Sequence, residues 1–156
     1  MMADYVITDL RAAPGFAEAV ADRVWRAWWR DDGVPLAALR ARLDESLGVP
    51  VAGIPSSFVA HRGGAFLGTA ALIASDMEAR PELTPWVAAL WVEPVARGQG
   101  IGRALAAHAA QAAFTAGHPR VHLCATSENA PYYLKLGWTR IEADADGLDI
   151  FSREPG

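Results

Sequence analysis

Residues 91–103 combine residue types and spacing that point to a specific chemistry. They read Trp-Val-Glu-Pro-Val-Ala-Arg-Gly-Gln-Gly-Ile-Gly-Arg, an apolar run followed by a glycine-rich turn and the start of a helical pattern. Glycines let backbone N–H groups approach a ligand closely, and a helix N-terminus adds unpaired donors and partial positive charge. Arg97 and Arg103 stand at the two ends of the loop and can pair with phosphate oxygens. The segment predicts a pyrophosphate cradle; a tight strand-to-helix turn without a ligand is the alternative.

The glycine spacing distinguishes between phosphate-binding loops. A dinucleotide fingerprint has Gly-x-Gly-x-x-Gly, whereas Arg103 stands where its last glycine would fall. A Walker-type loop requires Gly-Lys followed by Ser or Thr, which is missing from this segment. The Arg-x-x-Gly-x-Gly form over residues 97–102 instead resembles the acetyl-CoA pyrophosphate loop of the GNAT superfamily of N-acetyltransferases. A nucleotide or NAD binder is therefore disfavoured.

A second motif lies at residues 129–138, Asn-Ala-Pro-Tyr-Tyr-Leu-Lys-Leu-Gly-Trp. It is similar to the C-terminal motif of the same superfamily, in which an asparagine leads a short helix ending in Tyr-x-x-x-Gly-Phe, with Trp138 in place of the phenylalanine. By this match Tyr133, four residues before Gly137, stands at the position of the family's general acid. Its alternative is a half-buried core aromatic. Adjacent helical residues point about 100° apart, so only one of Tyr132 and Tyr133 is expected to face the thiol.

The resemblance implies a fold, a cosubstrate and a reaction. It implies a single GNAT-type domain over residues 1–156 that transfers acetyl directly from acetyl-CoA to a primary amine of a small molecule in a ternary complex. In the family the sheet separates at a bulge, where main-chain atoms pair with the pantetheine arm and an N–H polarises the thioester carbonyl. A homodimer is expected from the resemblance alone. The implied cofactor-binding residues are Leu90, Trp91, Val92, Arg97, Gly98, Gln99, Gly100, Ile101, Gly102, Arg103, Asn129 and Tyr133.

The group that deprotonates the amine is not identified by either motif. The apolar strand 86–92 contains no carboxylate, and Glu93 at its end precedes a proline that can turn it away. Asp31 and Asp32 follow the first helix, in a region that lines the acceptor site of similar proteins, and Asp76 lies in the loop before the strand. These three are the candidate bases, and solvated loop carboxylates are their alternative.

Other side chains that could do chemistry are interpreted mainly as structural. Trp25 and Trp28 are expected in the core, with Trp29 on another face of the helix. The three side chains could instead form the floor of an acceptor pocket. Cys124 is expected to be an inert strand residue. The four histidines lack ligand-like spacing, so no metal site is expected. Asn129 is expected to cap the short helix or to bond the cofactor arm.

Periodicity and turn signals predict the elements that must position these residues. Phe16, Val20, Val24 and Trp28 fall four apart on one face of the first helix. The strand 86–92 is apolar throughout, which predicts burial on both faces. The order is β-α-α-β-β-β-α-β-α-β-β, an α/β mixed sheet flanked by about four helices. Strands are predicted over 5–10, 57–61, 66–75, 86–92, 121–125, 138–142 and 148–152, and helices from 14 to about 30, from 35 to 47, over 101–116 and over 129–136.

Composition narrows the function classes. The 156 residues carry 14 Lys and Arg against 18 Asp and Glu, a net charge of -4, so nucleic acid is not an expected partner. One cysteine and the lack of a signal-like N-terminus or a long apolar run favour a cytoplasmic protein without membrane contact. Two other functions remain open, a catalytically inactive CoA-binding regulator and an acetyltransferase that acts on protein N-termini or lysines.

Overall fold

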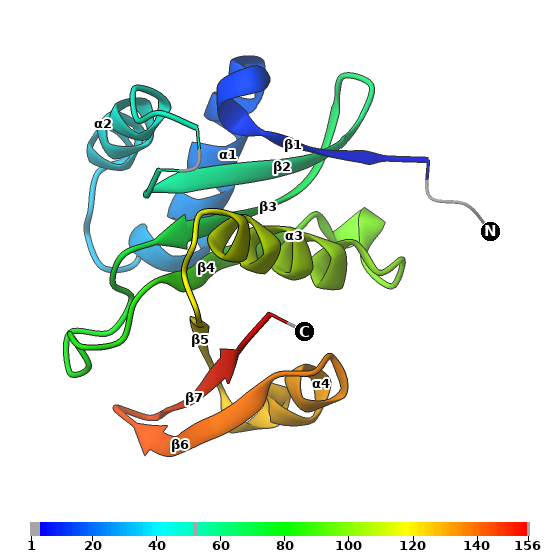
Figure 1. Cartoon of the computed structure of the whole chain (residues 1–156). Helices are drawn as coiled ribbons and strands as arrows, with labels where there is room; N and C mark the ends of the chain where they lie inside the picture. The colour runs from blue at the N-terminus through cyan, green and yellow to red at the C-terminus, as the bar shows by residue number, and fades with distance from the viewer. Residues whose placement is uncertain (1–3, 52, 156) are drawn as a thin grey trace.

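The computed structural model describes residues 4–51 and 53–155, which form a seven-stranded sheet with helices on both faces (Figure 1). The sheet has the strand order β1-β2-β3-β4-β5-β7-β6. The sequence predicts one domain over 1–156. Positions 1–3, 52 and 156 of that range lie outside the described residues. The strands are β1 Val6–Asp9, β2 Ser56–Arg62, β3 Ala65–Ile73, β4 Trp86–Val92, β5 Val121–Ala125, β6 Thr139–Ala145 and β7 Leu148–Arg153, and the α-helices are α1 Ala17–Val24, α2 Leu36–Leu47, α3 Ile101–Thr115 and α4 Ala130–Lys135.

The predicted mixed α/β fold and element order are confirmed. All neighbouring strands are antiparallel except β4 and β5, which are parallel and joined by the crossover helix α3. Helix α3 packs on β2, β3 and β4 from one face, while α1 and α2 cover the other face (Figure 1). The turn at Gly63 and Gly64 joins β2 to β3, and Asp146 and Gly147, both at positive φ, join β6 to β7. No helix within the described residues has the length and apolarity needed to cross a membrane.

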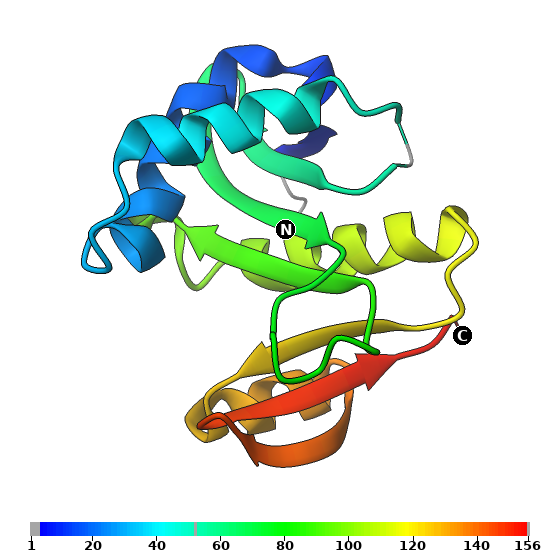
Figure 2. The ribbon, with the colours of Figure 1, turned by 90° about the vertical axis from the view of Figure 1, so that its left-hand side faces the viewer.

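Strands β4 and β5 separate along their length, as Figure 2 shows. Their only register pair is Trp86 with His122. The register between β3 and β4 shifts where Ala89, at φ 52°, and Leu90 lie opposite Ala70, which is a β-bulge. The prediction that β4 is buried on both faces is therefore wrong for most of its length. Trp86 and the next residue are buried, but the remaining five are half-buried because β5 has moved away.

The first helical segment changes its winding before it ends. α1 is followed by a π-helical turn over Trp25–Trp29, in which the N–H of Arg30 donates to the Trp25 carbonyl at 2.8 Å. A π turn adds one residue, so the face that carries Val24 continues at Trp29 and not at Trp28. Trp29 packs in the apolar cluster beneath α1 and α2, whereas Trp28 is 46% exposed. The prediction of a core Trp28 is wrong because a fixed spacing of four cannot register the extra residue.

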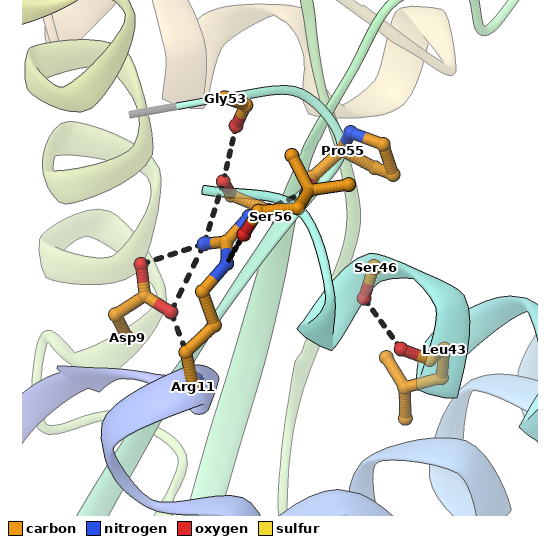
Figure 3. Close-up of polar contacts among 8 residues, drawn as sticks. Asp9, Arg11, Leu43, Ser46, Gly53, Pro55 and Ser56 are labelled. Carbon is orange, nitrogen blue, oxygen red and sulfur yellow. Dashed lines mark hydrogen bonds and ion pairs between the residues drawn. The ribbon is translucent and has the colours of Figure 1, made fainter. Parts of the chain in front are cut away.

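Arg11 ties the N-terminal segment to the loop before β2 (Figure 3). Its guanidinium pairs with Asp9 at 2.9 Å, donates to the Ser56 hydroxyl at 3.0 Å and donates to the carbonyls of Val49 and Pro55. Its side chain is only 10% exposed. The contacts satisfy a buried charge and fix β1 and β2 as one edge of the sheet.

Candidate functional site

The glycine-rich loop leads directly into helix α3, as predicted. Gly98 and Gly100 both adopt φ 81°, a left-handed conformation that favours glycine. A Cβ at Gly98 would meet no atom within 4 Å, so the backbone there is open to an approaching group. Gly100 precedes the first residue of α3, and no side chain caps the helix. The first turn of α3 also lacks acidic residues. An uncapped N-terminus with open backbone in front of it suits an anionic group.

Two arginines flank this loop in different ways. Arg97 donates from its Nε to the Val92 carbonyl at 2.9 Å, and its guanidinium carbon lies 4.9 Å from the centre of the Trp91 ring. Arg97 is therefore held against the end of β4. Arg103 is exposed in the first turn of α3, with its Cδ 3.7 Å from the position of a Cβ on Gly100. The two cations lie at opposite ends of the open loop, as their spacing predicts.

Tyr132 and Tyr133 diverge from α4, with rings 5.1 Å apart at 80°. The Tyr132 hydroxyl lies 3.8 Å from the position of a Cβ on Gly102, and the residue is 44% exposed. Tyr133 points inward, where its ring lies 5.7 Å from Phe151. Burial raises the pKa of the Tyr133 hydroxyl, and Tyr132 and Cys124 raise it further. Tyr133 therefore stays protonated well above neutral pH, whereas Tyr132 borders the N-terminus of α3.

Asp76 comes close to β5 from the loop between β3 and β4. The Cys124 thiol donates to the Asp76 carboxylate at 3.4 Å. Burial raises the pKa of Asp76, and burial together with the nearby carboxylate raises the pKa of Cys124 to about 12. Cys124 is thus a neutral thiol, as expected for an inert residue; Asp76 contributes to its raised pKa, and Cys124 contributes to that of Tyr133.

The loop that carries Asp76 is held in place by two residues that follow it. Met77 is buried in the small cluster with Trp86 and Ile150. Arg80 forms a two-point ion pair with Glu142 of β6. These contacts join the loop to the second half of the sheet, so Asp76 has a defined position although it lies in a loop.

The other predicted site residues lie elsewhere. Asp31 and Asp32 are exposed in the turn before α2, and Asp31 lies 3.5 Å from Arg30. Asn129 is exposed at the start of α4 and makes no capping hydrogen bond, so the prediction that it caps this helix is wrong. The helix begins instead from a 3-10 turn over Ser127–Asn129, with a proline in its first turn.

Two features of the site were not identified from the sequence. A Cβ at Gly68 of β3 would lie 2.7 Å from the Trp91 carbonyl oxygen, so β3 and β4 approach each other closely beside the bulge. A glycine inside an apolar strand pattern is the signal that could have indicated this approach. The second feature is an ion pair between Glu93 and Arg23 of α1, which holds the end of β4 against that helix. No local pattern connects these two residues.

A cavity of about 510 Å³ lies beside this ion pair, between α1, the π turn and the end of β4. Its lining consists of Arg23, Arg26, Ala27, Trp91, Glu93 and Pro94. The three tryptophans of residues 25–29 do not line it. Among the described residues, no group of three or more His, Cys, Asp or Glu side chains is arranged to hold a metal ion.

Solved structures with the same fold support the assignment of the architecture. An acetyltransferase from Streptococcus agalactiae is 15% identical, with a TM-score of 0.68 over 99% of this chain and 100% of the other. The yncA protein of Salmonella typhimurium, solved with its cofactor acetyl-CoA, is 18% identical, with a TM-score of 0.69 over 97% and 94%. An acyl-CoA N-acyltransferase from Pseudomonas aeruginosa is 20% identical, with a TM-score of 0.65 over 96% and 98%. At these identities the likeness shows the fold alone.

Sequence comparison supplies the family. No curated protein matches the chain significantly. The family model described as the acetyltransferase (GNAT) domain matches residues 55–140, which include β2 to β5, the glycine-rich loop, α3 and α4. The match covers more than half of the chain and contains the loop and Tyr133. The chain belongs to the GNAT acetyltransferase domain family.

Proposed function

We propose that the protein transfers an acetyl group from acetyl-CoA to a primary amine of a small molecule. The observation that carries this proposal is the separation of β4 from β5 beside an uncapped α3 and its left-handed glycines. The separated part of β4 leaves backbone groups without a β5 partner, and its apolar side chains are half-buried. Such a surface suits an extended, partly apolar arm that ends in a phosphate group.

The residues present fit acetyl-CoA as the cosubstrate. The N–H groups of residues 98–103 would hold the pyrophosphate, together with Arg97 and Arg103. Main-chain atoms of Leu90, Trp91 and Val92 would pair with the pantetheine arm in place of a neighbouring strand. Acetyl-CoA supplies an activated thioester, and an N–H near Trp91 would polarise its carbonyl.

Tyr133 is the proposed general acid. In the transfer, the amine nitrogen forms a bond to the acetyl carbon, the carbon–sulfur bond breaks, and the sulfur takes a proton. An alkyl thiol has a pKa of about 8.5, so its thiolate needs a nearby acid that is still protonated at neutral pH. Tyr133 meets this condition because a tyrosine hydroxyl is protonated at neutral pH, and burial favours this protonated form further. Tyr132 is the less suitable choice because its hydroxyl borders Gly102 in the first turn of α3 and the residue is exposed.

Asp76 is the proposed acceptor of the proton that the ammonium must lose. All three candidate carboxylates are exposed, but Asp76 alone is tied to the sheet, through the hydrogen bond that it accepts from the Cys124 thiol of β5. Its raised pKa makes it a better base than a solvated aspartate. Asp76 can act directly or through one water molecule.

A comparison of Tyr133→Phe with Tyr132→Phe tests the proposal. Purified protein is incubated with acetyl-CoA and a panel of primary amines, and thiol release and acetylated product are both measured. We expect turnover by the natural protein and a loss of about 100-fold or more in kcat for Tyr133→Phe, with unchanged acetyl-CoA affinity. Tyr132→Phe should keep most of its kcat. Equal kcat values for both variants would refute the assignment of Tyr133, and tight acetyl-CoA binding without any turnover would favour a regulatory CoA-binding protein.

A further inference from the structure

The cavity beside Trp91 presents hydrogen-bond donors that the protein does not use. Arg23 donates from Nε to Glu93 and from Nη1 to Asp22, which leaves its Nη2 without a partner among the described residues. Arg26 lies 3.1 Å from Asp22 through its Nε only, and its side chain is 60% exposed. Both terminal nitrogens of Arg26 are therefore available for a ligand.

Trp91 lines this cavity and carries an unpaired indole donor. Its indole Nε1 is buried and has no acceptor among the residues that the structure describes. A buried N–H without a partner costs free energy, so an acceptor that reached this nitrogen after a small movement of the ring would stabilise the site. The ring itself is held by Arg97 from one side. Trp91 is also the residue whose main chain is proposed to meet the thioester, so the cavity adjoins the reaction centre.

Free guanidinium donors, and not a net positive charge, suit this cavity to an anion, because Asp22 and Glu93 balance the charges of Arg23 and Arg26. Two guanidiniums and one carboxylate line the cavity, and the carboxylate, on Glu93, is already paired with Arg23. Asp22 pairs with both arginines but is not part of the lining. A planar carboxylate matches the fork of a guanidinium, and it can accept from two donors at once. Ala27 and Pro94 provide an apolar wall beside these donors.

The π-helical turn is what brings Arg26 and Ala27 to this place. The turn begins at Trp25, directly after the α1 residues that face the core, and it rotates the residues that follow. Single π turns in helices often occur at functional sites, because the extra residue shifts selected side chains out of the regular pattern. Here the residues of the turn include Arg26, which pairs with Asp22 through its Nε, and the small Ala27, and both line the cavity beside Trp91.

We infer that the acceptor amine carries a carboxylate, which this cavity binds through Arg26, with Arg23 and the wall at Trp91 completing the site. The substrate class is therefore an amino acid or another aminocarboxylate with an apolar body. This inference deepens the proposed function and rests on it. Arg26 acts here as a binding residue for the acceptor, not for acetyl-CoA.

The test uses matched compounds that differ only in the carboxylate. One set is L-leucine, L-leucinamide and 3-methylbutylamine, and the other is 5-aminopentanoate, 5-aminopentanamide and butylamine. For at least one set we expect kcat/KM to be about 10- to 100-fold higher with the carboxylate present, as loss of charge-assisted hydrogen bonds predicts. Arg26→Gln should abolish this preference with an unchanged KM for acetyl-CoA. Arg30→Gln, at an exposed arginine of the same helical segment outside the cavity lining, is the matched control and should keep the preference.

A binding measurement separates failure of this inference from failure of the proposed function. Thermal shifts are measured with CoA plus N-acetyl-L-leucine or N-acetyl-5-aminopentanoate, and with CoA plus the corresponding amides. Stabilisation by an acid, but not by its amide, that disappears in Arg26→Gln supports the inference without any turnover. Equal effects of acid and amide, no effect of either, or a preference that survives in Arg26→Gln would overturn it. Turnover of only the compounds that lack a carboxylate would leave the proposed function intact and reject the carboxylate site.

Discussion

Replacement of Gly68 by alanine should disturb both the stability and the site. The added Cβ would lie 2.7 Å from the Trp91 carbonyl oxygen, 3.1 Å from Leu105 Cδ1 and 3.4 Å from Val92 Cα. Two of these neighbours are backbone atoms of β4, so the strand must shift to make room. Overpacking of this kind costs about 1–3 kcal/mol. For a domain of this size the melting temperature should fall by roughly 2–12 °C.

The shift should also reach the reaction centre. Because Trp91 and Val92 are the displaced residues, acetyl-CoA affinity and kcat should fall even at a temperature where Gly68→Ala is fully folded. Gly64→Ala is the matched control, because a Cβ at Gly64 meets nothing within 4 Å and its φ is not left-handed. Thermal denaturation and steady-state kinetics of both variants provide the measurement. A Gly68→Ala protein with the melting temperature and kinetics of Gly64→Ala would refute the close approach of β3 and β4.

Two further predictions concern Asp76 and Arg11. Only the deprotonated form of Asp76 can accept a proton, so the plot of kcat against pH should fall on its acid side in the natural protein, at a pH above the usual pKa of aspartate. Asp76→Asn should remove this acid limb. The folded state binds the Asp76 proton more tightly than the unfolded state, so the free energy of unfolding falls as pH rises through the pKa of Asp76. Asp76→Asn should therefore be no less stable than the natural protein at pH 7. Clear destabilisation, or an acid limb that remains in the kcat profile, would contradict the role of Asp76 as the base. Arg11→Met should cost about 3 kcal/mol, since it leaves the partly buried Asp9 carboxylate unpaired. Arg40→Met, at an exposed pair with Asp44, should cost under about 0.5 kcal/mol in the same urea titration, and equal losses would contradict the Arg11 account.

Much of the fold could be predicted from local sequence signals. The bounds of β4 and β5 match the expectation, and α3 starts at the predicted Ile101. β4 is a continuous apolar run bounded by Pro85 and Glu93, and α3 lies between Gly100 and Gly117. The strand predicted over 138–142 is β6, which begins at Thr139 and extends to Ala145. Its pairing with β7 continues through two register shifts, which no local sequence pattern indicates.

The site was only partly predictable, for identifiable physical reasons. The loop and its flanking arginines are contiguous in sequence, so their types and spacing indicate a phosphate cradle directly. The contact between Asp76 and Cys124 joins residues 48 positions apart, and that between Arg23 and Glu93 joins residues 70 apart. Such contacts depend on how the sheet and helices pack. The π turn was missed because helical periodicity assumes a constant number of residues per turn.

The binding of acetyl-CoA tests the central claim most directly. A thermal-shift titration is made with acetyl-CoA, and NAD and ATP serve as controls. A ligand present at about 100 times its Kd stabilises a fold by about 2.7 kcal/mol, which should raise the melting temperature here by roughly 5–11 °C. The account predicts this rise with acetyl-CoA and none with NAD or ATP. No rise with acetyl-CoA, or an equal rise with NAD, would contradict the assignment of the separated strands and the glycine-rich loop as an acetyl-CoA site.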